Sequence, residues 1–133
     1  MPTSHLTLTT IGNAPLFADF VAARALIRRM RALEQQKALR SLAWSLVPHQ
    51  LQWLIISEDD ALQPIILTLE IHAIQALQPH GYKGPVWQHP TPSRLLHPLE
   101  APRNIARHIL AAPYRAGLVE HPGDYPHWDS TWL

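Results

Sequence analysis

Residues 41–57 read Ser-Leu-Ala-Trp-Ser-Leu-Val-Pro-His-Gln-Leu-Gln-Trp-Leu-Ile-Ile-Ser and carry the clearest structural signal in the chain. They contain two apolar runs, 41–47 and 50–57, which are separated only by Pro48 and His49. Short apolar runs that are joined by so brief a connection are typical of two antiparallel strands. The stretch therefore predicts a β-hairpin in the middle of the chain.

The segments on either side of this hairpin predict a strand and two helices. Residues 5–10 alternate apolar and polar side chains at period two, as a half-buried strand does. Asp19 is a suitable cap for a helix over 19–38, where apolar side chains recur with a spacing of about 3.6 residues. Residues 61–78 contain no helix breaker after Pro64, which suits the first turn of a second helix.

The last third of the chain is rich in proline and predicts one more strand and one more helix. Residues 85–97 begin like a strand, but Pro90 and Pro92 would interrupt a sheet ladder there. A third helix is expected over 100–112, followed by an irregular tail, 113–133. The resulting order, β-α-β-β-α-β-α, predicts a single α+β domain over 1–133, with an antiparallel sheet and helices packed on one of its faces.

The composition restricts the class of protein. The chain has 133 residues, of which 47% are hydrophobic and 16% charged, and it has no cysteine. It can therefore bury a core as one globular domain, and it has neither disulfides nor thiolate metal ligands. No apolar run reaches the roughly 18 residues of a membrane span, and residues 1–15 lack the basic start of a signal peptide. We expect a soluble cytoplasmic protein with no membrane partner.

The C-terminal segment resembles a known family. Ala-Ala-Pro-Tyr-Arg-Ala-Gly-Leu-Val-Glu, 111–120, is followed by Pro-Gly-Asp-Tyr-Pro-His-Trp, 122–128. This pattern resembles the tail of the REP-associated tyrosine transposases, which reads N-P-x-R-A-G-L-V-E and then D-Y-P. Segments 14–17, 43–48 and 84–88 agree with the same family in order and spacing. The family belongs to the insertion-sequence-200-like transposases of the HUH endonuclease superfamily, so the resemblance implies a ferredoxin-like fold and cleavage of single-stranded DNA beside a hairpin.

The resemblance also implies a particular chemistry. In the family, two imidazoles on one strand face hold Mg²⁺ or Mn²⁺, and a tyrosine on a nearby helix attacks the phosphorus. The positions that match the histidine pair are Gln50 and Gln52, whereas His49 is out of phase by one residue and should face the other side of the strand. His108 stands at the tyrosine position, and Ala112 stands where the family has a polar asparagine.

These four replacements predict that the catalytic site is degenerate. Two neutral amides without a carboxylate or an imidazole should hold a divalent cation only weakly, so we expect no cofactor and no metal site, with weak binding at Gln50 and Gln52 left open. His108 could act as a nucleophile, which leaves open a still-active DNA transposase with a non-standard site.

The distribution of charge bears on nucleic-acid binding, because affinity for a phosphate backbone comes mainly from lysine and arginine. The formal net charge is only +1, and no lysine or arginine occurs between Ser41 and Tyr82. The second helix is therefore apolar rather than basic. The candidates for phosphate contacts are Arg24, Arg28, Arg31, Lys83, Arg94, Arg103, Arg107 and Arg115.

Three functional interpretations follow from these observations. The preferred one is a catalytically defective transposase-like protein that still binds hairpin or single-stranded nucleic acid, DNA or RNA, without cutting it. The second is a domesticated scaffold whose apolar second helix binds another protein or a second copy of the chain through Ile66, Ile71 and Ile74. The third is a decaying mobile-element gene whose product still folds.

Overall fold

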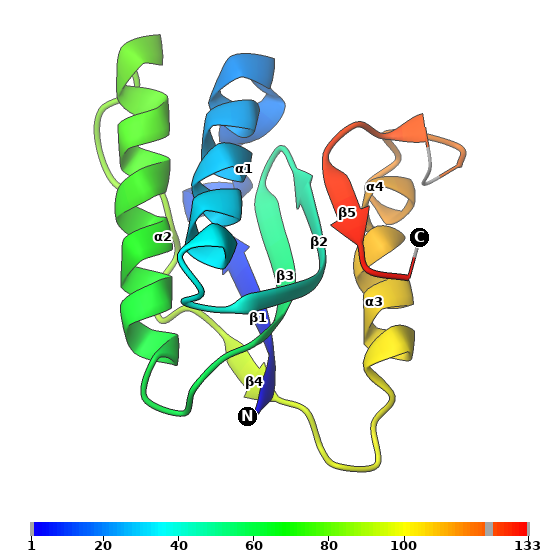
Figure 1. Ribbon diagram of the computed structural model, residues 1–133. Helices are drawn as coiled ribbons and strands as arrows, with labels where there is room; N and C mark the ends of the chain where they lie inside the picture. Colours follow the sequence, from blue (N-terminus) through cyan, green and yellow to red (C-terminus); the bar gives the residue numbers. More distant parts are fainter. Residues whose placement is uncertain (1, 122–123, 133) are drawn as a thin grey trace.

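The computed structural model describes residues 2–121 and 124–132 (Figure 1). Pro122 and Gly123, which open the second half of the tail motif, lie outside the described residues. The strands are β1 (Thr3–Thr9), β2 (Arg40–Val47), β3 (Gln50–Ile56), β4 (Ser93–Leu95) and β5 (Trp128–Ser130). The helices are α1 (Phe20–Gln35), α2 (Leu62–Leu77), α3 (Pro102–Leu110) and α4 (Ala112–Arg115), with 3₁₀ turns at Ile11–Asn13, Leu16–Ala18 and Gln78–His80.

The strands form one antiparallel sheet in the order β4-β1-β3-β2-β5. The predicted hairpin is confirmed: β2 and β3 pair with Trp44 opposite Trp53 and Ser45 opposite Gln52. Together with α1 and α2, the first four strands follow the β-α-β-β-α-β order of a ferredoxin-like fold. The α+β class is therefore confirmed.

Helices α1 and α2 cover one face of the sheet and enclose the main core. The predicted cap of α1 is confirmed, because Asp19 Oδ1 accepts a hydrogen bond of 3.0 Å from the backbone N–H of Ala22. The fully buried side chains of this core include Leu6, Leu8, Leu26, Ile27, Met30, Leu51, Trp53 and Leu69.

Helix α3 lies on the opposite face, so the expectation that all helices pack on one face is wrong (Figure 1). Ala106 and Ile109 of α3 pack against Leu42 and Leu54, and the hydroxyl of Ser45 donates a buried hydrogen bond of 2.9 Å to the carbonyl of Ile109. The physical reason is that β2 and β3 are buried on both faces, and a sheet of this kind needs cover on each side.

The segment after Pro113 differs from the irregular tail that we expected. Helix α4 continues to Arg115, and β5 pairs with β2, with Trp44 opposite Asp129. Without β5, the outer backbone groups of β2 would have no partner in the sheet. Backbone bonds from Leu46 N to the carbonyl of His127 (3.0 Å) and from Thr131 N to the carbonyl of Leu42 (2.9 Å) complete the pairing. Among the described residues, none of the helices has the length and apolar character that crossing a membrane requires.

Candidate functional site

Strand β3 places Gln50 and Gln52 on the sheet face that α3 covers. Gln52 is 6% exposed and lies opposite Ser45, whose hydroxyl reaches α3. Gln50 is partly buried and lies opposite Val47 at the hairpin end. The period-two spacing therefore brings both amides together on the sheet face beneath α3, as the sequence predicted.

The two amides belong to a chain of hydrogen bonds that crosses β1 and β3. His5 Nε2 lies 3.1 Å from Gln52 Oε1, Gln52 Nε2 donates to Gln50 Oε1 at 3.1 Å, and Gln50 Nε2 donates to Thr9 Oγ1 at 3.2 Å. Both amide oxygens thus already accept hydrogen bonds from the protein. These are the oxygen atoms that a metal ion would need.

His5 is a member of this site that the sequence analysis did not single out. Burial lowers its pKa from the ordinary value of 6.5, the hydrogen bond with Gln52 opposes this effect, and the positive charges of Arg94 and His108 lower the pKa further. His5 is therefore neutral near pH 7. Its place in the period-two pattern of β1, in phase with Thr7 and Thr9, was the signal that could have revealed it.

The other two residues that we matched to the family's motif lie on α3 and α4. His108 is exposed, and burial followed by the charge of Arg115 lowers its pKa from 6.5. The charge of a protonated His108 is among the causes that lower the pKa of His5. Ala112 is 7% exposed and offers only a methyl group. The prediction for His49 is wrong, because this residue lies in the turn between β2 and β3 rather than on a strand face.

The side chains of Gln50, Gln52 and His5 do not fit a Mg²⁺ or Mn²⁺ ion. Two amides and a neutral imidazole carry no negative charge, whereas Mg²⁺ and Mn²⁺ favour carboxylate oxygens and water. Within residues 2–121 and 124–132, no cluster of three or more histidines or carboxylates comes together in a geometry that could hold a metal.

Comparison with known proteins identifies the architecture. The sequence matches no protein-family model and no curated protein sequence. A solved structure of a REP-associated tyrosine transposase bound to a REP hairpin superposes with a TM-score of 0.75 over 96% of this chain and 75% of that chain, at 17% sequence identity. This chain has the REP-associated transposase fold. A Deinococcus radiodurans R1 protein classed as a transposase also matches, with a TM-score of 0.57 and 18% identity, over 87% of this chain and 89% of that chain.

The resemblance that we found in the sequence motifs is thus confirmed at the level of the fold. Within the transposase fold, the eight candidate cations differ in their surroundings. Arg94 pairs with Glu100 at 2.6 Å, and Arg115 donates to the carbonyl of His108 at 2.6 Å, so both have partners inside the molecule. Lys83 lies in the exposed turn after α2. The remaining five are on the solvent sides of α1 and α3: Arg24, Arg28, Arg31, Arg103 and Arg107.

The exposed apolar surface of α2 differs in one residue from the surface predicted. Ile66 is 5% exposed and packs into the main core, so its assignment to the surface is wrong. Ile71 and Ile74 are exposed as expected, and Leu67 is the third exposed residue, at 58%. These three side chains recur at intervals of four and three residues and form one outward stripe.

Proposed function

We propose that this chain is a transposase-like protein that binds hairpin or single-stranded nucleic acid and does not cleave it. The observation that carries the proposal is the hydrogen-bond chain from His5 through Gln52 and Gln50 to Thr9, which occupies the strand positions of the family's metal-binding pair. The fold around this chain of hydrogen bonds is shared with a transposase whose structure was solved in complex with a REP hairpin.

The expected lack of cleavage rests on the chemistry of the side chains at the matched positions. Phosphodiester cleavage in this family requires a cation on the scissile phosphate and an aligned nucleophile. Gln50 and Gln52 are neutral amides whose oxygens accept hydrogen bonds from the protein. A neutral His108 could attack phosphorus, but the two amides would not hold a cation on the phosphate oxygens, and the guanidinium of Arg115 already donates to the carbonyl of His108.

The retention of binding is supported by the arginines that have no internal partner. Phosphate contacts need exposed cations and do not need a working metal site. Arg28, Arg31, Arg103 and Arg107 are exposed, and none of them forms an ion pair within the described part of the chain. Nucleic-acid binding can therefore persist after the catalytic positions have changed.

The binding half is tested by fluorescence anisotropy of a labelled REP-like hairpin and of an unstructured oligonucleotide, titrated with the protein over a series of salt concentrations. We expect saturable binding that weakens as salt increases. Absence of binding at the lowest salt concentration would contradict the proposal.

The cleavage half is tested by incubating the protein with Mg²⁺ or Mn²⁺ and a labelled single strand, followed by denaturing electrophoresis. We expect neither a shorter strand nor a covalent protein–DNA adduct. An adduct that disappears in His108→Ala would instead identify an active transposase with a histidine nucleophile.

A second candidate function is self-association through the α2 stripe of Leu67, Ile71 and Ile74. These side chains are 58%, 46% and 38% exposed, and α2 carries no lysine or arginine, so two copies can approach without repulsion between cations. Light scattering at increasing concentration should show a dimer that is insensitive to salt, and Ile71→Lys should return it to a monomer. A monomer at high concentration would rule out this second function.

A further inference from the structure

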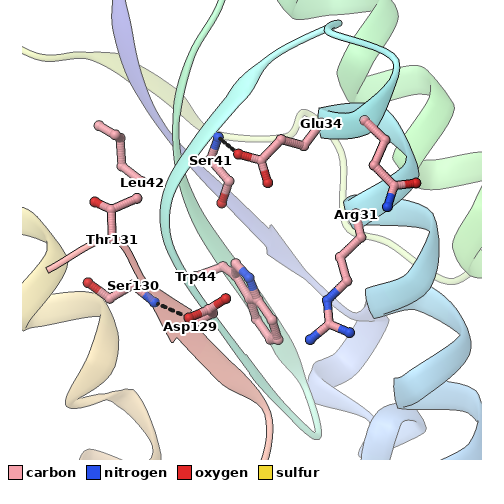
Figure 2. Close-up of a pocket in the computed structure, with 9 residues that line it drawn as sticks. Arg31, Glu34, Ser41, Leu42, Trp44, Asp129, Ser130 and Thr131 are labelled. Carbon is pink, nitrogen blue, oxygen red and sulfur yellow. Dashed lines mark hydrogen bonds between the residues drawn. The ribbon is translucent and has the colours of Figure 1, made fainter. Parts of the chain in front are cut away.

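Strand β5 forms one edge of the sheet, with α1 on one side of it and α3 on the other (Figure 1). Figure 2 shows the groove on the α1 side, where Arg31 lines the same hollow as Trp44, Asp129 and Ser130. The two arginines of α3 line a second hollow on the opposite side, together with Ser130 and Trp132. Ser130 of β5 thus borders both hollows.

Arg31 of α1 and Arg103 and Arg107 of α3 line these hollows, and Arg24 and Arg28 precede Arg31 on α1; the five are here called the β5 rim. Phe20, one turn before Arg24 on α1, has its ring centroid 5.4 Å from that of His127, which immediately precedes β5, and the charge of Arg24 lowers the pKa of that histidine. Arg28 falls on the same side of α1, because it is four residues after Arg24 and three before Arg31. The sequence separates the two groups widely, and only the folded sheet brings them to one edge.

The arginines of the β5 rim are available to an external anion. No ion pair and no side-chain hydrogen bond involves any of them among residues 2–121 and 124–132. Two carboxylates line the hollow with Arg31 but form no ion pair with it: Asp129 Oδ1 accepts from Ser130 N at 2.8 Å and Glu34 Oε1 accepts from Ser41 N at 3.1 Å.

The spacing of the two arginine groups indicates the kind of partner. A helix packs about 10 Å from the sheet that it covers. The arginine groups on α1 and α3, which cover opposite faces, therefore lie on the order of 20 Å apart before their side chains reach inward. One strand of nucleic acid follows a single line of phosphates and would meet one group. The two backbones of a paired stem can meet both.

We propose that the β5 rim contacts the two phosphate backbones of the paired stem of a DNA hairpin. This inference rests on the proposed function and adds its contact surface and the part of the ligand that it holds. The α1 half of the rim lies on the sheet face opposite to Gln50 and Gln52, so stem binding would extend beyond the positions of the family's metal-binding pair.

The test measures the dissociation constant of a labelled DNA hairpin over a salt series for three variants. Two variants remove one half of the rim each: Arg24→Ala/Arg28→Ala/Arg31→Ala and Arg103→Ala/Arg107→Ala. The control, Arg29→Ala/Lys37→Asn/Arg40→Ala, removes the same charge as the α1 variant at exposed positions that line neither hollow. Each lost phosphate contact reduces the slope of log K against log salt by about 0.9. We expect reductions of about 3 for the α1 variant, about 2 for the α3 variant and near zero for the control.

The outcomes separate the failure of this inference from that of the proposed function. No binding by the unmutated protein would overturn both. If all three variants weaken binding in proportion to the charge that they remove, the assignment of the contact to the β5 rim is wrong, although the protein still binds nucleic acid. A slope change in only one of the two rim variants would lead to the same conclusion. Equal losses with an unpaired strand would overturn the stem assignment, and tighter binding of an RNA hairpin would overturn the assignment to DNA.

Two further variants guard against effects of misfolding. Arg24→Lys/Arg28→Lys/Arg31→Lys keeps the charge and should keep the slope. Asp129→Asn removes the carboxylate that β5 places in the same hollow as Arg31, so binding should tighten at low salt, which an unfolded protein could not produce. Glu58→Gln, an exposed change away from β5, should leave binding unaltered, and equal tightening by both variants would contradict the rim.

Discussion

His5 Nε2 lies 3.1 Å from the side-chain oxygen of Gln52, and this contact joins β1 to β3 on the sheet face beneath α3. Burial keeps the pKa of His5 below 6.5, although the hydrogen bond to Gln52 opposes this shift. A neutral imidazole and a neutral amide therefore meet on this face of the sheet.

Gln52→Glu should raise the pKa of His5, because a carboxylate beside the imidazole stabilises its protonated form. The shift is measured by NMR titration of the histidine ring protons. Gln63→Glu, an exposed change at the start of α2, is the matched control and should leave the His5 titration unchanged. An unaltered His5 pKa in Gln52→Glu would show that the two side chains do not interact in solution.

Gln50→His/Gln52→His should create a metal site. The two imidazoles would share the strand face that His5 already borders, and imidazole binds Mn²⁺ and Zn²⁺ better than an amide does. Isothermal titration calorimetry should detect ion binding by this variant, and neither the unmutated protein nor Gln50→Asn/Gln52→Asn should match it. Equally tight Mn²⁺ binding by the unmutated protein would contradict the conclusion that Gln50, Gln52 and His5 do not fit a divalent cation.

The stability of the protein should fall as the pH drops below about 6.5. His127 is 5% exposed, its Nδ1 has no partner among the described residues, and burial followed by the charge of Arg24 lowers its pKa. The unfolded chain therefore binds a proton that the folded chain resists, so the free energy of unfolding rises with pH across this window. Urea unfolding from about pH 5 to about pH 8 should show a shallower dependence in His127→Leu. An unchanged slope would exclude His127 as a contributor.

A pair of serine substitutions tests the contact between β2 and α3. Ser45→Ala should lower the free energy of unfolding by about 1–3 kcal/mol, because the carbonyl of Ile109 loses a buried donor. Ser4→Ala removes a buried hydroxyl that has no partner in the described part of the chain and should cost nothing. Equal losses in urea unfolding would mean that the bond between Ser45 and Ile109 adds no stability.

Truncation of two leucines of α2 should change the free energy of unfolding by very different amounts. Leu69 is fully buried in the main core, so Leu69→Ala should lower the free energy of unfolding by about 2–5 kcal/mol. Leu67 is 58% exposed, so Leu67→Ala should change it by less than about 0.5 kcal/mol. Thermal or urea unfolding provides the measurement. A large loss in Leu67→Ala alone would show that the outward stripe is covered in solution.

Local patterns in the sequence were sufficient for the hairpin, for α1 with its Asp19 cap, and for the shared orientation of Gln50 and Gln52. Each of these depends on side-chain periodicity or on a cap within a few residues of its partner. The same reasoning placed Ile66 on the surface, because an apolar helix with little amphipathic contrast does not reveal which of its faces is covered.

The sequence by itself determined β1 to β4, α1 to α3 and the chemical character of residues 50 and 52, because these depend on residues that are neighbours along the chain. Only the tertiary structure decided that α3 covers the second face of the sheet and that β5 closes the edge of β2. It also decided that His5 joins the two glutamines and that arginines from α1 and α3 meet around one strand. These relationships depend on pairing and packing between distant segments, which are set by the burial of both faces of β2 and β3 rather than by any local pattern.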